Sequence, residues 1–144
     1  MKNIGVSIIT VVYNNIRGIE RTIQSVLNQS YNNIEYIIID GGSTDGTLDV
    51  IKRYENRISY WISEADEGIY NAMNKGILKA HGSFLNFMNS GDTFVTSTTI
   101  ERLIERYEKG DKIIYGNILK CYDRRKERTS GIVSSHPEIG RAHV

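Results

Sequence analysis

The chain has 144 residues, of which 40% are hydrophobic and 24% are charged, and its formal net charge is +1 at pH 7. This length suits one domain with a core of its own, and the near-zero charge argues against a nucleic-acid partner, because such domains usually carry a strong basic excess. The single cysteine, Cys121, excludes an internal disulfide framework and a zinc site built from several cysteines.

The first apolar run, residues 6–13, contains Ser7 and Thr10 and is too short to span a bilayer. It also lacks the cleavage-site pattern of a signal peptide. We therefore expect no transmembrane segment and a cytoplasmic location. Peripheral attachment at the inner membrane, through a further segment of the parent protein, stays open.

Apolar runs alternate with amphipathic segments along the chain. Residues 6–13 are rich in Val, Ile and Thr, which is typical of a buried strand, and residues 16–27 carry Ile, Val and Leu at helical spacings of three and four. The same reasoning predicts further strands at 34–39, 58–62, 84–88 and 113–115, and further helices at 47–54, 69–80 and 100–107. This order predicts an α/β fold: a mostly parallel sheet with helices on both faces.

The last residues of the chain are expected to differ in origin from the rest. Residues 138–144 resemble the peptide that a common sequencing-library adapter encodes when it is translated in frame, and residues 134–137 are expected to share that source. We therefore expect a domain over residues 1–133 and a non-native tail over 134–144. A genuine tail is the alternative, and in either case His136 and His143 are not catalytic candidates.

Polar segments follow three of the expected strands, at residues 10–15, 40–46 and 89–92. In a doubly wound sheet, ligands bind beyond the carboxyl ends of the strands. We therefore expect these three segments to converge at one edge of the sheet and to form a ligand site.

The segment at 40–46 places Asp40 at a strand end, where its carboxylate can accept hydrogen bonds from a base or a sugar. Two glycines follow, which permit a close approach between backbone and ligand, and Ser43 or Asp45 can cap the next helix. The alternative is a turn in which Asp and Gly serve backbone geometry alone.

The segment at 89–92 ends in Asp92, a carboxylate placed to hold a divalent cation through oxygen. Such a cation could bridge the phosphates of a nucleoside diphosphate and stabilise a leaving group. A turn, or an acid that caps the next helix, is the alternative. Lys75 could reach a phosphate from its helix, although most helix lysines are solvated.

Taken in this order, the segments resemble family 2 glycosyltransferases of the GT-A fold, particularly bacterial enzymes that build exopolysaccharide, capsule or lipopolysaccharide. The likeness covers about residues 4–120, with matching blocks at 7–14, 25–31, 35–47, 63–76 and 86–92. Each block alone is weak evidence for the family. All of them in the same order over most of the chain are specific evidence. The resemblance implies a GT-A domain that is incomplete at its carboxyl end.

The resemblance also implies a reaction and its site residues. A sugar would pass, with inversion, from a nucleoside diphosphate donor, most often a UDP-sugar, to a hydroxyl of a saccharide or lipid-linked acceptor, with Mn²⁺ or Mg²⁺ as cofactor. The nucleotide would be bound by Thr10, Tyr13, Asp40, Ser43, Asp45, Asn74, Lys75 and Asn89. Asp92 matches the last acid of the family's Asp-x-Asp-type motif and would bind the metal.

Two departures from the family pattern stand out. The family commonly has acids at the positions of Asn89 or Gly91, so the expected metal site of this chain has fewer acidic ligands. The general base, which deprotonates the acceptor hydroxyl in inverting members, has no convincing match before residue 144, and Glu64 and Asp66 are not assigned that role. We therefore expect this chain to bind the donor without efficient turnover.

Two other functions remain as alternatives. A sugar-nucleotide pyrophosphorylase would need a Gly-rich, Arg-bearing loop after the first strand, where this chain has Tyr13, Asn14 and Asn15. A non-catalytic nucleotide-binding module is the second. A dinucleotide oxidoreductase is excluded, because the Gly-x-Gly-x-x-Gly motif is absent from that position.

Overall fold

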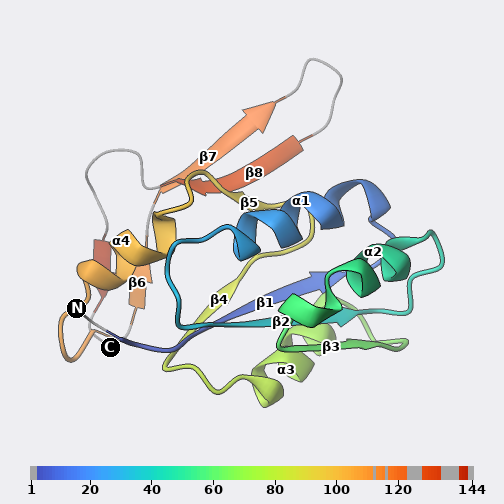
Figure 1. Ribbon diagram of the computed structural model, residues 1–144, viewed down its shortest axis with the longest axis horizontal. Coiled ribbons are helices and arrows are strands. Elements are labelled where there is room, and N and C mark those ends of the chain that lie inside the picture. The colour runs from blue at the N-terminus through green and yellow to red at the C-terminus, as the bar shows by residue number, and fades with distance from the viewer. Residues whose placement is uncertain (1–2, 112, 116, 123–127, 134–139, 143–144) are drawn as a thin grey trace.

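The computed structural model describes the backbone of residues 3–111, 113–115, 117–122, 128–133 and 140–142, and the side chains of residues 3–111. Strands and helices alternate through most of this part of the chain (Figure 1). The strands are β1 (Val6–Val12), β2 (Ile34–Asp40), β3 (Tyr60–Ser63), β4 (Phe84–Phe87) and the short β5 (Thr93–Phe94). The helices are α1 (Ile16–Leu27), α2 (Thr47–Arg53), α3 (Ile69–Lys79) and α4 (Thr99–Glu105), with a 3-10 turn, η1, at Glu55–Arg57. The expected elements are confirmed within a few residues, and β5 is one that the apolar pattern did not predict.

A four-stranded parallel sheet forms the centre of the molecule, with the strand order β3-β2-β1-β4. Val6 of β1 pairs with Ile34 on one side and with Phe84 on the other, and all seven residues of β1 are buried. A strand that is covered on both faces needs apolar side chains on both, which explains its continuous Val and Ile run. Because the four strands are parallel, their carboxyl ends lie at the same edge.

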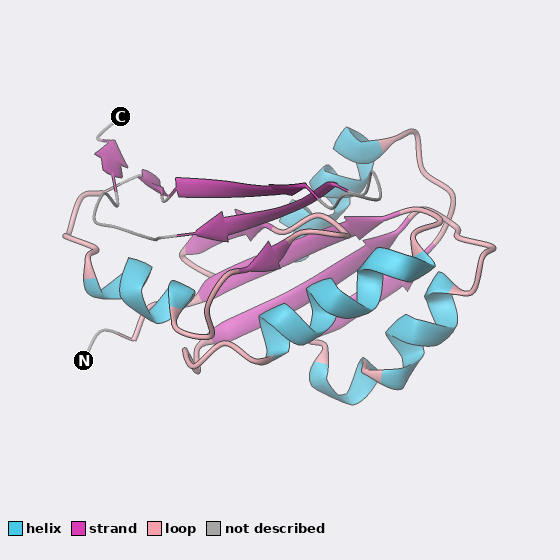
Figure 2. Cartoon of the chain, turned by 90° about the horizontal axis from the view of Figure 1, so that it is seen from above, coloured by secondary structure: helices cyan, strands magenta, loops and turns pink. Residues whose placement is uncertain are grey.

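Helices cover both faces of this sheet, as Figures 1 and 2 show. On one face, Ile8 of β1 belongs to a core cluster that includes Ile19 of α1 and residues of α2 and α4. On the opposite face, Ile9 clusters with Ala72 of α3. None of the described helices has both the length and the apolar composition needed to cross a membrane. The predicted α/β fold with helices on both faces is confirmed.

Gly76 allows α3 to approach the sheet closely. A Cβ atom at this position would lie 2.5 Å from Cγ2 of Ile9 in β1, which is far inside van der Waals contact. The close packing fixes the distance of α3 from the sheet. It therefore also fixes the positions of the other α3 residues relative to the sheet.

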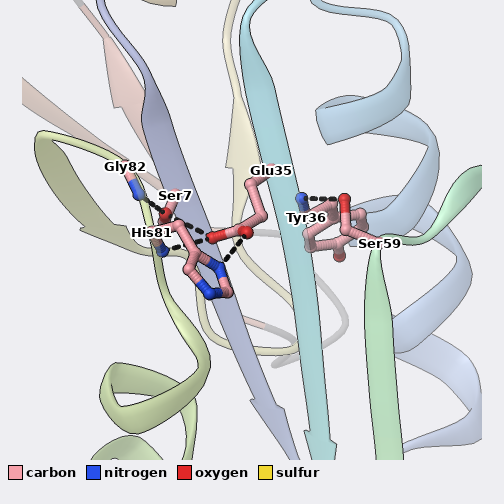
Figure 3. Close-up of polar contacts among 6 residues, drawn as sticks. All are labelled: Ser7, Glu35, Tyr36, Ser59, His81 and Gly82. Carbon is pink, nitrogen blue, oxygen red and sulfur yellow. Dashed lines mark hydrogen bonds and ion pairs between the residues drawn. The ribbon is translucent and has the colours of Figure 1, made fainter.

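A polar cluster joins three segments at the amino end of the sheet (Figure 3). The carboxylate of Glu35 accepts hydrogen bonds from the Ser7 hydroxyl (2.7 Å) and the His81 backbone N–H (2.8 Å), and its second oxygen lies 2.8 Å from Nδ1 of His81. The N–H of Gly82 in turn donates to the Ser7 hydroxyl at 2.8 Å. We call these four residues the Glu35 cluster, and it fastens the turn before β4 to β1 and β2.

The strands after residue 111 form separate small sheets. β6 (Ile113–Tyr115) pairs antiparallel with β9 (Gly140–Ala142), while β7 (Asn117–Tyr122) pairs antiparallel with β8 (Arg128–Val133) and β8 runs parallel to β5. The strand predicted at residues 113–115 is confirmed, but it lies outside the parallel sheet. A short apolar run predicts a strand but not its partner, and here the partner comes from residues 140–142. Residues 134–139 and 143–144 lie outside the described residues, so the tail over 134–144 stays a prediction.

Candidate functional site

Three polar loops follow the carboxyl ends of the parallel strands. We call them the β1 loop (residues 13–15), the β2 loop (residues 41–46) and the β4 loop (residues 88–92). Main-chain bonds tie two of them to β1: Gly41 N–H donates to Val12 O at 2.9 Å, and Ser90 N–H donates to Val11 O at 3.2 Å. The predicted convergence of these segments at one sheet edge is therefore found in the structure.

Side chains lock the β1 loop to the β2 loop. The backbone N–H of Asn14 donates to the Ser43 hydroxyl at 2.8 Å, and the N–H of Thr44 donates to Oδ1 of Asn14 at 2.8 Å. Asn14 has a φ of 47°, a left-handed conformation that asparagine tolerates better than most residues. Ser43 thus shapes the loop.

Asp40 is fully buried, and protein donors surround its carboxylate. Oδ2 accepts from the N–H groups of Gly42 (3.1 Å) and Ser43 (2.9 Å) and from the Ser63 hydroxyl (2.6 Å). Oδ1 accepts from the Ser43 hydroxyl at 2.5 Å. A buried carboxylate requires such donors, so the side chain of Asp40 holds the β2 loop in shape.

Asp45 is exposed and joins the β2 loop to the start of α1. Oδ1 accepts from the hydroxyl (2.6 Å) and the N–H (3.0 Å) of Thr47, and Oδ2 accepts from the N–H of Ile16 at 3.0 Å. The Thr47 hydroxyl bond is the main cause that lowers the pKa of Asp45; slight desolvation opposes it, and the Ile16 and Thr47 amides assist it. The charged side chain of Asp45 therefore links the β2 loop to the start of α1.

Tyr13 and Thr10, both predicted to line the pocket, lie in different environments. The side chain of Tyr13 is 66% exposed at the end of β1, where it is open to a ligand. Thr10 is fully buried, and its hydroxyl lies 2.9 Å from the hydroxyl of Tyr36 in the core. The Thr10 side chain supports the core and offers no surface to a ligand, because residue 10 lies on the same face of β1 as Ile8, which packs with α1, α2 and α4.

The β4 loop carries Asn89 and Asp92. The Asp92 N–H donates to Asn89 O at 2.9 Å, which closes a tight turn, and Gly91 within it has a φ of 101°. Oδ1 of Asn89 is enclosed and has no hydrogen-bond partner in the described part of the chain. Asn15 connects this turn to the β1 loop, because its Nδ2 donates to the Ser90 hydroxyl at 3.0 Å.

The segment between β3 and α3 lies against the β2 loop. Lys75 Nζ lies 2.9 Å from Oε1 of Glu64 and 3.5 Å from the carbonyl of Ala65. Asn74, the other predicted contact on α3, is exposed. A Cβ on Gly41 would lie 2.8 Å from Oδ2 of Asp66. The Lys75 ammonium is thus placed near the loops, but it is held by Glu64 when no ligand is present.

Residues 7–142 of the chain match the family model described as Glycosyl transferase family 2. The chain belongs to this family. The resemblance drawn from the sequence blocks is therefore confirmed.

Named relatives of this family 2 chain come from several bacteria. An uncharacterized glycosyltransferase of Mycobacterium tuberculosis (strain ATCC 25618 / H37Rv) is 42% identical over 101 residues, which cover 69% of this chain and 38% of the relative. TuaG of Bacillus subtilis (strain 168), whose name assigns it to teichuronic acid biosynthesis, is 42% identical over 90 residues, which cover 60% of this chain and 36% of TuaG. The chain thus spans less than half the length of these relatives.

Solved structures share the fold of this family 2 chain. S. aureus TarS, residues 1–349 in complex with UDP, aligns with a TM-score of 0.61 at 25% identity, over 68% of this chain and 30% of that one. The mannosyltransferase PcManGT of Pyrobaculum calidifontis, in complex with GDP-Man and Mn²⁺, aligns with a TM-score of 0.69 at 20% identity, over 85% of this chain and 36% of that one. These matches bear out the GT-A fold expected from the sequence.

The donor set of the β4 loop suits a hard cation but is small. Within residues 3–111, no group of three or more His, Cys, Asp or Glu side chains could hold a metal ion. The oxygens at hand are the carboxylate of Asp92 and the partnerless amide oxygen of Asn89. Oxygen ligands of this kind fit Mg²⁺ or Mn²⁺, and Mg²⁺ commonly takes its remaining ligands from substrate phosphates and water. The residues present therefore fit a cation that the donor helps to bind.

A cavity of about 420 Å³ lies beside the site, between α1 and residues 93–97. Its described lining includes Arg21, Gln24 and Phe94, and it contains none of the predicted site residues.

Sequence reasoning missed two residues that organise the loops. Asn15 accepts from Gly18 N–H at 3.1 Å as the cap of α1, in addition to its bond to Ser90. An asparagine directly before an amphipathic helix is a recognisable cap signal. Thr22 of α1 bonds to the β4 loop, and its position within a helix gave no sign of this contact.

Proposed function

We propose that the protein to which this chain belongs transfers a sugar from a nucleoside diphosphate donor to an acceptor hydroxyl, in the synthesis of a bacterial surface polysaccharide. The described domain binds the donor at the loop edge. One observation carries the proposal: three loops from separate parts of the chain are bonded into one edge, which presents an exposed aromatic ring at one loop and an acid at another. The name of TuaG and the UDP complex of TarS support it.

Tyr13 and the β2 loop form the side of the site for the nucleoside, and UDP is the expected form. The exposed ring of Tyr13 offers a face on which a base can stack. Asp40, Ser43 and Asp45 shape the adjoining backbone, since their oxygens bond to loop N–H groups or to neighbouring hydroxyls. This division of labour assigns the nucleoside contact to Tyr13 and the loop surface.

Asp92 and Asn89 form the side of the site for the diphosphate. The Asp92 carboxylate would bind Mn²⁺ or Mg²⁺, and the partnerless Asn89 oxygen would assist it. The bound cation supplies charge neutralisation on the leaving diphosphate. Lys75 would add a positive charge from α3, once its ammonium turns from Glu64 to a phosphate, with the exposed amide of Asn74 beside it.

The acceptor side is assigned to the parent protein as a whole. The acceptor is expected to be a saccharide or a lipid-linked saccharide, in the cytoplasm or at the inner membrane surface. Residues 1–133 are the donor-binding part in this proposal, and no residue of the chain is assigned as the general base.

Calorimetric titration of the 144-residue chain with UDP, with and without Mn²⁺, tests the donor site. We expect binding that depends on Mn²⁺ and that Asp92→Ala weakens by about ten-fold or more, since a coordinating oxygen is lost. The matched control is Asp49→Ala, which removes an exposed acid from α2 and should leave the affinity unchanged. A folded chain that binds neither UDP nor GDP, or that binds equally well without Asp92, would contradict the proposal.

A transfer assay on the parent protein separates the enzyme from a binding module. Release of UDP that depends on an acceptor supports glycosyl transfer. Donor binding without any release of UDP would favour a non-catalytic module, and formation of a sugar nucleotide from UTP and a sugar phosphate would favour a pyrophosphorylase.

A further inference from the structure

Thr22 lies in the middle of α1, is fully buried, and directs its hydroxyl at the β4 loop. Its Oγ1 accepts a hydrogen bond from the N–H of Gly91 at 2.9 Å and lies 2.8 Å from the carbonyl oxygen of Asp92, to which it donates. A second acceptor, the carbonyl of Gly18 in the same helix, is more distant at 3.3 Å. One hydroxyl therefore holds the main chain on both sides of the Gly91–Asp92 peptide bond.

This double contact fixes the backbone that carries Asp92. The Gly91 N–H and the Asp92 carbonyl belong to the peptide groups that precede and follow the Gly91–Asp92 unit. Glycine is the most permissive residue for backbone rotation, and Gly91 has a φ of 101°, so the turn depends on outside contacts to hold one conformation. With both peptide groups held by a helix that packs on the sheet, the Cα–Cβ bond of Asp92 keeps one direction.

We propose that Thr22 is a positioning residue for the cation at Asp92, an inference that rests on the proposed function. Thr22 is assigned no contact with the cation or the donor; it acts by holding the backbone from which the Asp92 carboxylate extends. Groups that orient a metal ligand in this way commonly change metal affinity by about 10- to 100-fold when they are removed. Loss of the Thr22 hydroxyl should therefore lower the affinity for the cation more than it lowers the stability of the fold.

Thr22→Val tests this inference, because valine keeps the shape and branching of threonine but removes the hydroxyl. The measurement is a Mn²⁺ titration of the 144-residue chain at fixed UDP, followed by the electron paramagnetic resonance signal of free Mn²⁺. We expect Thr22→Val to bind Mn²⁺ about ten-fold more weakly, and Thr22→Ser, which retains the hydroxyl, to stay within about three-fold of the wild type. If Thr22→Val loses its cooperative unfolding transition, Thr22→Ala replaces it.

Ser25 provides a matched control one turn further along α1. Its hydroxyl makes the same kind of contact with β5: it accepts from Phe94 N–H at 2.7 Å and donates to Phe94 O at 3.4 Å. Ser25→Ala should lower the melting temperature as Thr22→Val does, but leave the Mn²⁺ affinity unchanged. If Thr22→Val and Ser25→Ala lowered the Mn²⁺ affinity equally, Thr22 would be a purely structural residue and the inference would be overturned.

The remaining outcomes separate this inference from the proposed function. If wild-type binding of UDP depends on Mn²⁺ and on Asp92, but Thr22→Val binds Mn²⁺ as the wild type does, the inference on Thr22 is wrong and the proposed function stands. If the wild-type chain binds UDP with no dependence on Mn²⁺, the metal role of Asp92 fails and the inference fails with it.

Discussion

At the scale of the residue, the ammonium that we propose to contact the diphosphate is already paired with a carboxylate. Lys75 has a side chain that is 26% exposed, and it forms a 2.9 Å ion pair with Glu64, whose side chain is 50% exposed. An ion pair so open to solvent contributes about 0–1 kcal/mol, so a phosphate can compete for the ammonium at little cost. In the proposed site, Glu64 would hold the Lys75 ammonium until a phosphate replaces it.

Glu64→Gln should strengthen UDP binding, since the phosphates would no longer compete with a carboxylate for Lys75. The expected gain is about two- to five-fold, as befits an exposed ion pair, and titration with UDP at fixed Mn²⁺ measures it. Glu67→Gln removes an exposed acid of the same segment that has no described ion pair, and it serves as the control. Weaker binding by Glu64→Gln would mean that Glu64 orients Lys75 more than it opposes the ligand.

At the scale of the element, the Glu35 cluster joins β1, β2 and the turn before β4 at the end of the sheet remote from the loops (Figure 3). Burial, the largest single influence, raises the pKa of Glu35. The hydrogen bonds from the His81 backbone, the Ser7 hydroxyl and the His81 ring, together with the charge of His81, outweigh it and hold the pKa below the ordinary value of 4.5. The ionised form of Glu35 is therefore the one that the fold favours.

This shift sets a direction for stability against pH. Because the pKa of Glu35 is lower in the folded than in the unfolded chain, its stabilisation is complete above the ordinary value of 4.5 and is lost as the pH falls through the folded value. Urea unfolding of Glu35→Gln at pH 7 and pH 3.5 should show a smaller loss of stability on acidification than the wild type shows. Glu55→Gln, at an exposed site in η1, should follow the wild-type profile. An unchanged profile for Glu35→Gln would show that the cluster is not the acid-sensitive element.

Gly82 gives the same cluster a steric test. A Cβ at this position would lie 2.6 Å from the backbone nitrogen of Ser7 and 2.7 Å from its hydroxyl, so β1 and the turn before β4 would have to separate. We expect Gly82→Ala to destabilise the fold by about 1–3 kcal/mol, the usual range for overpacking, as measured by thermal unfolding. Gly110→Ala is an instructive comparison, because no atom lies within 4 Å of a Cβ there and any loss would come from its φ of 106° alone. A Gly82→Ala variant as stable as the wild type would contradict the close fit.

At the scale of the whole molecule, the apolar runs and the polar segments after them sufficed to predict the parallel sheet, its two helical layers and the edge at which Asp40 and Asp92 lie. The pattern is local for these features: each run decides its own strand, and the parallel topology brings the strand ends together. The burial of Thr10 also follows from a local rule, because residues two apart on a strand share a face, and Ile8 is a core residue.

The interior of the site could not be read from the sequence in the same way. The bonds of Asn15 to Ser90 and of Thr22 to Gly91 join residues 75 and 69 positions apart. No periodicity encodes such a pairing, and a threonine within an amphipathic helix is not distinctive. The partner of β6 was likewise not predictable, because antiparallel pairing with residues 140–142 leaves no mark on the apolar run at 113–115.

The long-range bonds among the three loops also make ligand readiness and folding one event. The loop conformations require the folded chain, since each loop is held by side chains from another element. A donor that binds there recognises only the native chain and raises its apparent stability by mass action. The melting temperature of the chain should therefore rise with increasing UDP and Mn²⁺, which makes it an independent measure of the proposed donor binding.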